Sequence, residues 1–277
     1  MTRFLTGYVY APRIAQKKGA IIIMERGSKH ILEQKKILEK NPHKKNEAIP
    51  NRNIKCNLKA YQFANFISVA SQHVKESFLL HQYPENRIFV NPYGVDLSMF
   101  KPLPNIPKKY DVIMVGGWGY EKGCDLIVEA IRKTNYSFIH VGSIKDVDFP
   151  QEKNFTHIDP VDQSKLIEYY NQAKVFILPS RQDGFGMVLS QALACNLPII
   201  GSNNCGAPDL KKMVELPEYI TIIKDYTADA IVTAIHTAIK NYEQLGERIY
   251  AGNAIENLTW EAYGKRYANF LHKIIKQ

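Results

Sequence analysis

The sequence has 277 residues, more than one hydrophobic core usually holds, and this length predicts two domains. Hydrophobic residues make up 45% and charged residues 23%, which argues against a mainly disordered or fibrous chain. No uncharged apolar run reaches the roughly 18 residues of a membrane-spanning helix. The four cysteines form no CxxC pair and the opening residues do not resemble a signal peptide, so we expect a cytoplasmic protein without disulfides.

The net charge is concentrated in the first part of the chain. Residues 1–100 contain 16 lysines and arginines against seven acidic residues, a net charge of +9, whereas residues 101–277 contain 20 of each. A basic segment indicates an anionic partner, such as a phospholipid surface or a lipid-linked phosphate, or else only a solvated lysine-rich surface. Nucleic acid is disfavoured, because no known nucleic-acid-binding motif is present.

The first hundred residues predict a thin domain of three strands and two or three helices. The strands are expected at 19–24, 65–71 and 87–93, and a helix at 30–40. Residues 41–53 contain too few apolar side chains to pack and predict a mobile loop. The three prolines within residues 101–109 predict a semi-rigid linker to the second part.

From residue 110 onward, short apolar runs alternate with amphipathic stretches. This alternation is typical of a doubly wound parallel sheet covered by helices. Asp162 or Ser164 and Thr227 stand where helix N-caps are expected. The predicted strands are 110–116, 136–142, 155–158, 174–179, 197–202 and 219–223, and the predicted helices are 124–133, 164–173, 188–195 and 225–245.

A glycine-rich turn, VGGWGYEKG at 115–123, follows the first of these strands. Backbone N–H groups ahead of a helix hold phosphate well, and Lys122 would supply the opposite charge. The turn matches neither the dinucleotide fingerprint nor the P-loop. Taken alone, it is equally compatible with a tight turn that carries a solvated lysine.

A second candidate segment, residues 180–202, combines a strand end, a glycine-bounded turn and a helix. Gly184 and Gly186 would let the backbone approach a sugar or phosphate, with Asp183 accepting hydrogen bonds from hydroxyls. Asp183 is as compatible with a plain helix cap, and Asp209 with a first-turn carboxylate. The histidines lack metal-ligand spacing and no GxSxG elbow is present, so neither a metal site nor a hydrolase triad is predicted.

In combination, VGGWGYEKGCDLI, FILPS, DGFGMVLSQALACNLPIIGS and CGAPDL resemble the donor-binding domain of family 4 retaining glycosyltransferases of the GT-B fold. NPYGVDLSMFKP at 91–102 resembles the hinge of that family, and residues 258–274 resemble its terminal helix, which returns toward the first domain. The resemblance implies a complete Rossmann-like donor domain at 101–277. Residues 1–100 would form an abbreviated Rossmann-like acceptor domain that lacks the family's first part.

The resemblance also implies site residues. Lys122 matches the lysine that contacts the donor diphosphate, and Asp183 stands in place of the first glutamate of the E-x7-E signature, so these two are the expected catalytic residues. Glycine replaces the arginine usual at 117, and glutamine the second glutamate, which holds the ribose. The donor-binding residues implied in this way are Gly116, Gly117, Phe185, Gly186, Met187, Val188 and Gln191.

The expected reaction is hexosyl transfer from a UDP- or GDP-sugar to a glycan or lipid-linked acceptor, with retention of configuration and without metal or other cofactor. Positioning and electrostatic stabilisation of the diphosphate would carry it. The setting would be surface polysaccharide or lipid-linked glycan assembly at the inner membrane face. The alternative is a truncated, catalytically silent relative that serves as a nucleotide-binding or interaction subunit. A GT-B epimerase fits the segment 183–191 less well than a transferase does, and a GT-B phosphorylase is disfavoured because no lysine stands out as suited to a pyridoxal Schiff base.

Overall fold

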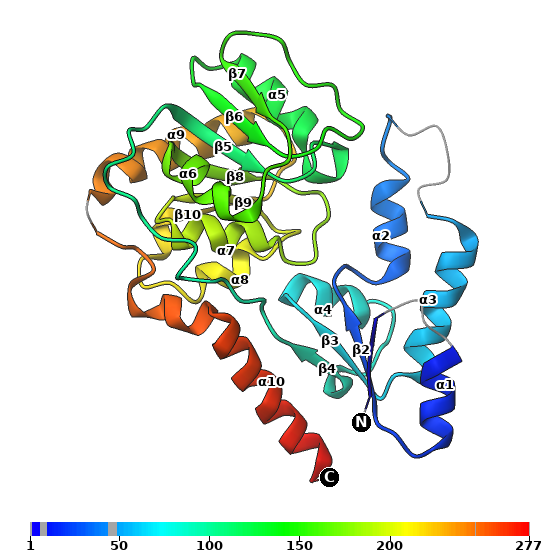
Figure 1. The fold of residues 1–277 in the computed structure, drawn as a ribbon. Helices are drawn as coiled ribbons and strands as arrows, with labels where there is room; N and C mark the ends of the chain where they lie inside the picture. Colours follow the sequence, from blue (N-terminus) through cyan, green and yellow to red (C-terminus); the bar gives the residue numbers. More distant parts are fainter. Residues whose placement is uncertain (1, 6–9, 44–48, 247, 277) are drawn as a thin grey trace.

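The computed structural model describes residues 2–5, 10–43, 49–246 and 248–276, and it contains two parallel sheets (Figure 1). The first sheet has four strands in sequential order: β1 (Thr2–Leu5), β2 (Ile22–Arg26), β3 (Phe66–Val69) and β4 (Ile88–Val90). Its helices are α1 (Tyr10–Lys17), α2 (Ile31–Leu38), α3 (Asn51–Phe63) and α4 (Gln72–Leu79), with a 3-10 turn at Glu85–Arg87.

The second sheet has six strands in the order β10-β9-β8-β5-β6-β7, all parallel. This is the strand order of a Rossmann domain, so the predicted α/β fold class is confirmed. The strands are β5 (Tyr110–Val115), β6 (Phe138–Val141), β7 (Phe155–Ile158), β8 (Ala173–Leu178), β9 (Ile199–Ser202) and β10 (Ile220–Ile223). The helices are α5 (Cys124–Arg132), α6 (Leu166–Asn171), α7 (Met187–Ala194), α8 (Ala207–Lys211) and α9 (Ala228–Leu245).

Every strand and helix predicted in this second part is present, with ends that differ by a few residues. Thr227 caps α9, as predicted, and its hydroxyl accepts from the amide of Ala230. Asp162 caps a 3-10 turn at 163–165 and accepts from the amide of Ser164, so α6 begins two residues later than predicted. Residues 101–109 contain no helix or strand, as expected of a linker.

The first part is richer than its sequence indicated. Strand β1 and helix α1 were not predicted, and β2 runs on through two charged residues, Glu25 and Arg26, which are buried. The loop predicted at 41–53 is wrong at its end, because α3 begins at Asn51, and residues 44–48 lie outside the described residues. Asn57 stands on the buried side of α3 with Ile54 and Tyr61, which hides the helical hydrophobic pattern.

Helix α10 (Trp260–Ile275) leaves the second sheet and packs against the first, as predicted for the terminal helix (red in Figure 1). The Phe270 ring stacks on Phe89 at a centroid distance of 4.1 Å and meets Phe66 edge-on at 5.3 Å. The Tyr267 hydroxyl donates to Glu25 Oε1 at 2.7 Å. The chain therefore returns to its first sheet. In the described part of the chain, no helix has the length and apolar character needed to cross a bilayer.

Replacing Phe270 by alanine should loosen this docking. The loss of the stacked and edge-on ring contacts is expected to lower the free energy of unfolding by roughly 1–3 kcal/mol. Urea denaturation followed by circular dichroism measures the change. Lys273→Ala, at an exposed position of the same helix, is the control and should change it by less than about 0.5 kcal/mol. Equal effects of the two substitutions would contradict the packing role of Phe270.

Candidate functional site

The candidate site lies where the strand order of the second sheet reverses, between β5 and β8. Ligands of doubly wound sheets bind at this point, beyond the carboxyl ends of the strands. The loop after β5 carries Lys122 and the loop after β8 carries Asp183. The Lys122 ammonium donates to Asp183 Oδ2 at 2.5 Å, and the two side chains are only 20% and 16% exposed. The structure thus joins the two residues expected to be catalytic.

The surroundings hold Lys122 in its charged form. Burial by itself lowers the pKa of Lys122, but the neighbouring carboxylates, Asp183 above all and then Glu121, outweigh burial and leave this pKa raised. A buried lysine without such partners would lose its proton readily. The ion pair therefore maintains a positive charge at the sheet edge.

The ion pair opens into a pocket of about 330 Å³, a size at the low end for small-molecule sites. Eight of the nine predicted site residues line this pocket, and Gly117 does not. Gly27, which follows β2, and Tyr93, from the segment expected to be the hinge, also line it, so the pocket lies between the two sheets. The lining residues are Gly27, Tyr93, Val115, Gly116, Lys122, Leu178, Asp183, Phe185, Gly186, Met187, Val188 and Gln191.

The start of α7 supplies further positive potential to the pocket. Gly186 occupies the N-cap position with φ of +80°, and no side chain caps the helix. Only glycine adopts this backbone readily, and a Cβ there would also lie 2.8 Å from Leu178 Cδ2. The first-turn N–H groups of Met187 and Val188 are left for a ligand, where the helix dipole favours an anion.

Gln191 reaches the pocket from the middle of α7. Its Oε1 accepts a hydrogen bond from the hydroxyl of the buried Tyr170 at 2.9 Å, and none of the described residues accepts a hydrogen bond from its NH₂ group. A glutamate at this position could only accept hydrogen bonds from a ligand, whereas the glutamine NH₂ group can donate them. Phe185 contributes through its backbone, because its side chain is buried against Tyr93 and Gly206.

The first part of the chain holds the loop that carries Asp183. The Ser71 hydroxyl donates to the Gly184 carbonyl at 2.6 Å, and His73 Nε2 donates to the Asp183 carbonyl at 2.7 Å. Burial lowers the pKa of His73 to about 4, so the ring is neutral near pH 7. Asp209, expected only as a first-turn carboxylate, accepts from the amide of Gln72 at 3.0 Å.

These contacts escaped prediction, although the sequence held a signal for them. Ser71 is the last residue of the strand predicted at 65–71 and His73 follows it closely, just as Asp183 follows the end of its own strand. Residues after parallel strands gather at one sheet edge. What the sequence could not show is that the edges of the two sheets face each other.

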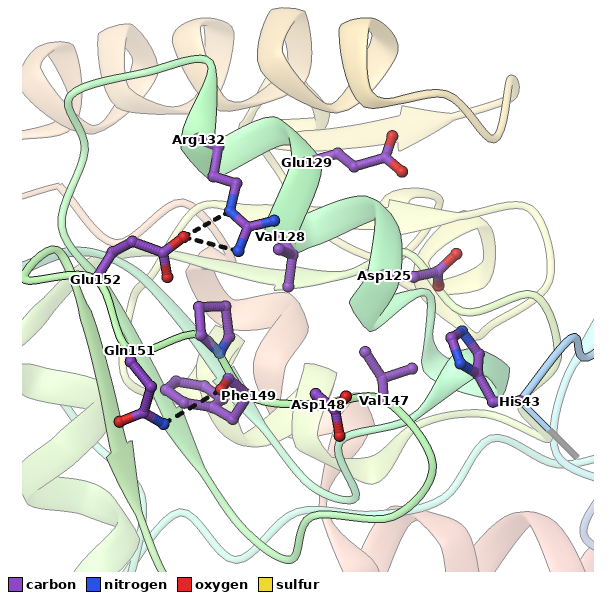
Figure 2. Close-up of a pocket in the computed structure, with 11 residues that line it drawn as sticks. His43, Asp125, Val128, Glu129, Arg132, Val147, Asp148, Phe149, Gln151 and Glu152 are labelled. Carbon is purple, nitrogen blue, oxygen red and sulfur yellow. Dashed lines mark hydrogen bonds and ion pairs between the residues drawn. The ribbon is translucent and has the colours of Figure 1, made fainter.

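A larger hollow of about 730 Å³ lies elsewhere, between α5 and the β6–β7 connection (Figure 2). Its charged side chains are mainly acidic: Asp125, Glu129, Asp148 and Glu152 against Arg132. Arg132 is itself paired with Glu152 at 2.7 Å. A phosphate would be repelled there, so we place the candidate site at the smaller pocket. Among the described residues, no group of three or more potential metal ligands comes together.

The family described as "Glycosyl transferases group 1" matches residues 98–254, more than half of the chain and the whole of the six-stranded sheet. The chain belongs to this family. The resemblance seen in its sequence motifs is thereby confirmed. The match contains Gly116, Lys122, Asp183 and Gln191, but it does not by itself assign a role to any of them.

Similar proteins include glycosyltransferases of different specificity. "Probable sucrose-phosphate synthase" of Thermosipho melanesiensis is 26% identical over 77% of this chain and 56% of its own length. "GDP-mannose-dependent alpha-(1-6)-phosphatidylinositol monomannoside mannosyltransferase" of Mycolicibacterium smegmatis is 23% identical over 75% of this chain and 62% of its own. Anabaena HepE, solved with UDP and glucose, superposes with a TM-score of 0.72 at 14% identity, over 95% of this chain and 74% of its own. The chain thus spans only about 60% of the length of the Thermosipho and Mycolicibacterium relatives.

Gly184→Ala tests the contact between the two parts. A Cβ at Gly184 would lie 1.9 Å from the Gly27 carbonyl oxygen, so we expect the free energy of unfolding to fall by roughly 1–3 kcal/mol. Gly264→Ala in α10 is the matched control, because a Cβ there would meet no described atom within 4 Å apart from the adjoining backbone of its own helix; it should raise stability by about 0.5–1 kcal/mol. Urea unfolding of both variants measures these changes. An unchanged stability of Gly184→Ala would contradict the close contact.

Proposed function

We propose that the protein transfers a hexosyl group from a nucleotide sugar to a glycan or lipid-linked acceptor, with retention of configuration. The main support is the pocket at the strand-order reversal, where a charged lysine and the open N-terminus of α7 meet a carboxylate. Those are the groups needed to hold a diphosphate and a sugar. Retention is proposed from the sequence resemblance to retaining enzymes.

In this proposal the donor separates the ion pair and binds to both of its residues. The diphosphate would take the Lys122 ammonium and the first amides of α7, which neutralise its charge as the bond to the sugar breaks. Asp183, released from Lys122, would then accept hydrogen bonds from the sugar hydroxyls. Gln191 would donate to the ribose, since Tyr170 holds its oxygen. No metal is needed for this arrangement, because the protein supplies the cation.

The base of the donor is proposed to be uracil or guanine. HepE was solved with UDP, and the mycobacterial relative is named as GDP-mannose-dependent. The pocket as described contains no side chain that by itself selects one of the two. Titration with both nucleotides is therefore part of the test.

A catalytically silent relative is the second candidate, and two features of the site favour it. Gln191 presents its NH₂ group where the related enzymes have a carboxylate, and Asp183 is shorter than the glutamate it replaces. Such a protein would bind the nucleotide but not turn over the sugar donor. Release of free nucleotide from the donor, with and without glycan acceptors, separates this candidate from an active transferase.

We also propose that the face formed by α1 and α3 contacts an anionic membrane at the cytoplasmic side. The two helices pack against each other on the side away from the six-stranded sheet (Figure 1). Neither helix contains an acidic residue. Tyr10 and Ile14 are 86% and 53% exposed, among basic residues, so the face pairs apolar anchors with positive charge. Its exposed basic residues are Arg13, Lys17, Lys18, Arg52, Lys55 and Lys59.

Calorimetric titration with UDP, GDP, ADP and their sugar conjugates tests the donor site. We expect one nucleotide to bind, and Lys122→Ala to weaken binding by roughly tenfold or more through loss of a charged contact. Lys174→Ala is the matched control, because it breaks a similar pair with Asp111 at the opposite end of the same strands. Equal affinity of Lys122→Ala and wild type would refute the site.

Co-sedimentation with phosphatidylcholine vesicles, with and without phosphatidylglycerol, tests the membrane face. Binding is expected only with the anionic lipid, and Lys55→Gln/Lys59→Gln should lower it by roughly thirtyfold, because each of the two basic residues near the surface contributes about 1 kcal/mol. Lys153→Gln/Lys240→Gln removes the same charge from exposed positions elsewhere and serves as control. Equal partitioning onto both kinds of vesicle would contradict this proposal.

A further inference from the structure

We propose that Lys145 is a second substrate-binding cation and that it contacts the donor diphosphate beside Lys122. Lys145 lies in the connection between β6 and β7, outside every segment that the sequence motifs singled out. The inference rests on the proposed function, because it adds a residue to the same nucleotide-sugar site.

The backbone brings Lys145 to the glycine-rich turn. The amide of Trp118 donates to the Ser143 carbonyl at 2.8 Å, and the amide of Lys145 donates to the Trp118 carbonyl at 2.9 Å. Residues 143–145 thus run parallel to the turn and pair with it. This pairing fixes the position of the Lys145 backbone relative to Gly117.

The Lys145 side chain occupies the space over Gly117. A Cβ at position 117 would lie 2.3 Å from Lys145 Cε and 2.8 Å from its Nζ. The aliphatic part of the lysine therefore occupies the volume that a side chain at 117 would need, and its ammonium lies beside the turn. The adjacent Gly116 lines the candidate pocket. The absence of a side chain at 117 lets the Lys145 side chain lie directly against the turn.

The Lys145 charge is available to a ligand. Within the described part of the chain, no hydrogen bond or ion pair engages its ammonium, and the side chain is exposed. The carboxylate of the next residue, Asp146, is already held by the amide of Tyr120 at 2.9 Å and by Asn41 at 2.7 Å.

The other cations near the turn are already engaged. Lys122 shares its charge with Asp183. Arg181 pairs bidentately with Asp125 at 2.5 and 2.7 Å, and its guanidinium lies 3.8 Å from the centre of the Tyr120 ring. Each phosphate of a diphosphate carries negative charge, and the total exceeds what Lys122, already paired with Asp183, can neutralise. Lys145 supplies the missing charge from a neighbouring loop, and glycine at 117 makes room for it.

Variants of Lys145 can separate its charge from its stem. Lys145→Met keeps an apolar stem over Gly117 without the ammonium, and Lys145→Arg keeps a cation. In calorimetric titration of the full chain with UDP and GDP, Lys145→Met should weaken binding roughly tenfold and make it less salt-dependent, while Lys145→Arg stays within about threefold of wild type. Binding of uridine and guanosine, followed by ligand-observed NMR, should not change.

Lys153→Met is the matched control, an exposed lysine of the same connection that should bind as wild type does. The exchange Gly117→Arg/Lys145→Ala should recover much of the affinity lost in Lys145→Ala, because removal of the lysine stem makes room for the arginine. Unchanged affinity of Lys145→Met, together with lost affinity of Lys122→Ala, would overturn this inference and leave the proposed function standing. Absence of nucleotide binding by the wild-type chain would instead overturn the proposed function, and this inference with it.

Discussion

The ion pair between Lys122 and Asp183 is the interaction on which the site depends. Each partner comes from a loop after a different strand, and the pair closes across the point where the strand order reverses. Partly buried charges are stable only when they are paired, so the loops are held in register by electrostatics as well as by the sheet. In the proposed function, a diphosphate replaces Asp183 as the partner of Lys122, so that donor binding would release the carboxylate.

The first part of the chain contributes to the site more than its basic charge suggested. Ser71 and His73 bind the two carbonyls of the Asp183–Gly184 segment, and the Gly27 carbonyl lies so close to Gly184 that a side chain at position 184 has no room. Helix α10 ties the end of the chain back to this first sheet through Phe270. The position of Asp183 is therefore set from both sheets, and a change in the first part should alter the candidate pocket.

The second sheet was predictable because its central strands are buried on both faces and read as continuous apolar runs between helical segments. The first sheet was less predictable. Strand β2 ends in buried Glu25 and Arg26, whose partners lie far along the chain or across a turn, and α3 buries an asparagine. Charged and amide side chains at buried positions break the hydrophobic pattern, and only the fold supplies the partners that make their burial tolerable.

The sequence by itself determined the family, the second sheet and the segments that meet at the candidate pocket, because glycine-rich turns and strand ends are local features whose geometry follows from the nearest residues. The tertiary structure decided the contacts between distant elements. These are Gly27 and Tyr93 in the pocket wall, the hydrogen bond from His73 to the Asp183 carbonyl, and Lys145 over Gly117. Each of these joins residues well separated in the chain. Such contacts depend on how two sheets and their loops are placed in space, and that placement is the sum of many packing interactions that no short segment encodes.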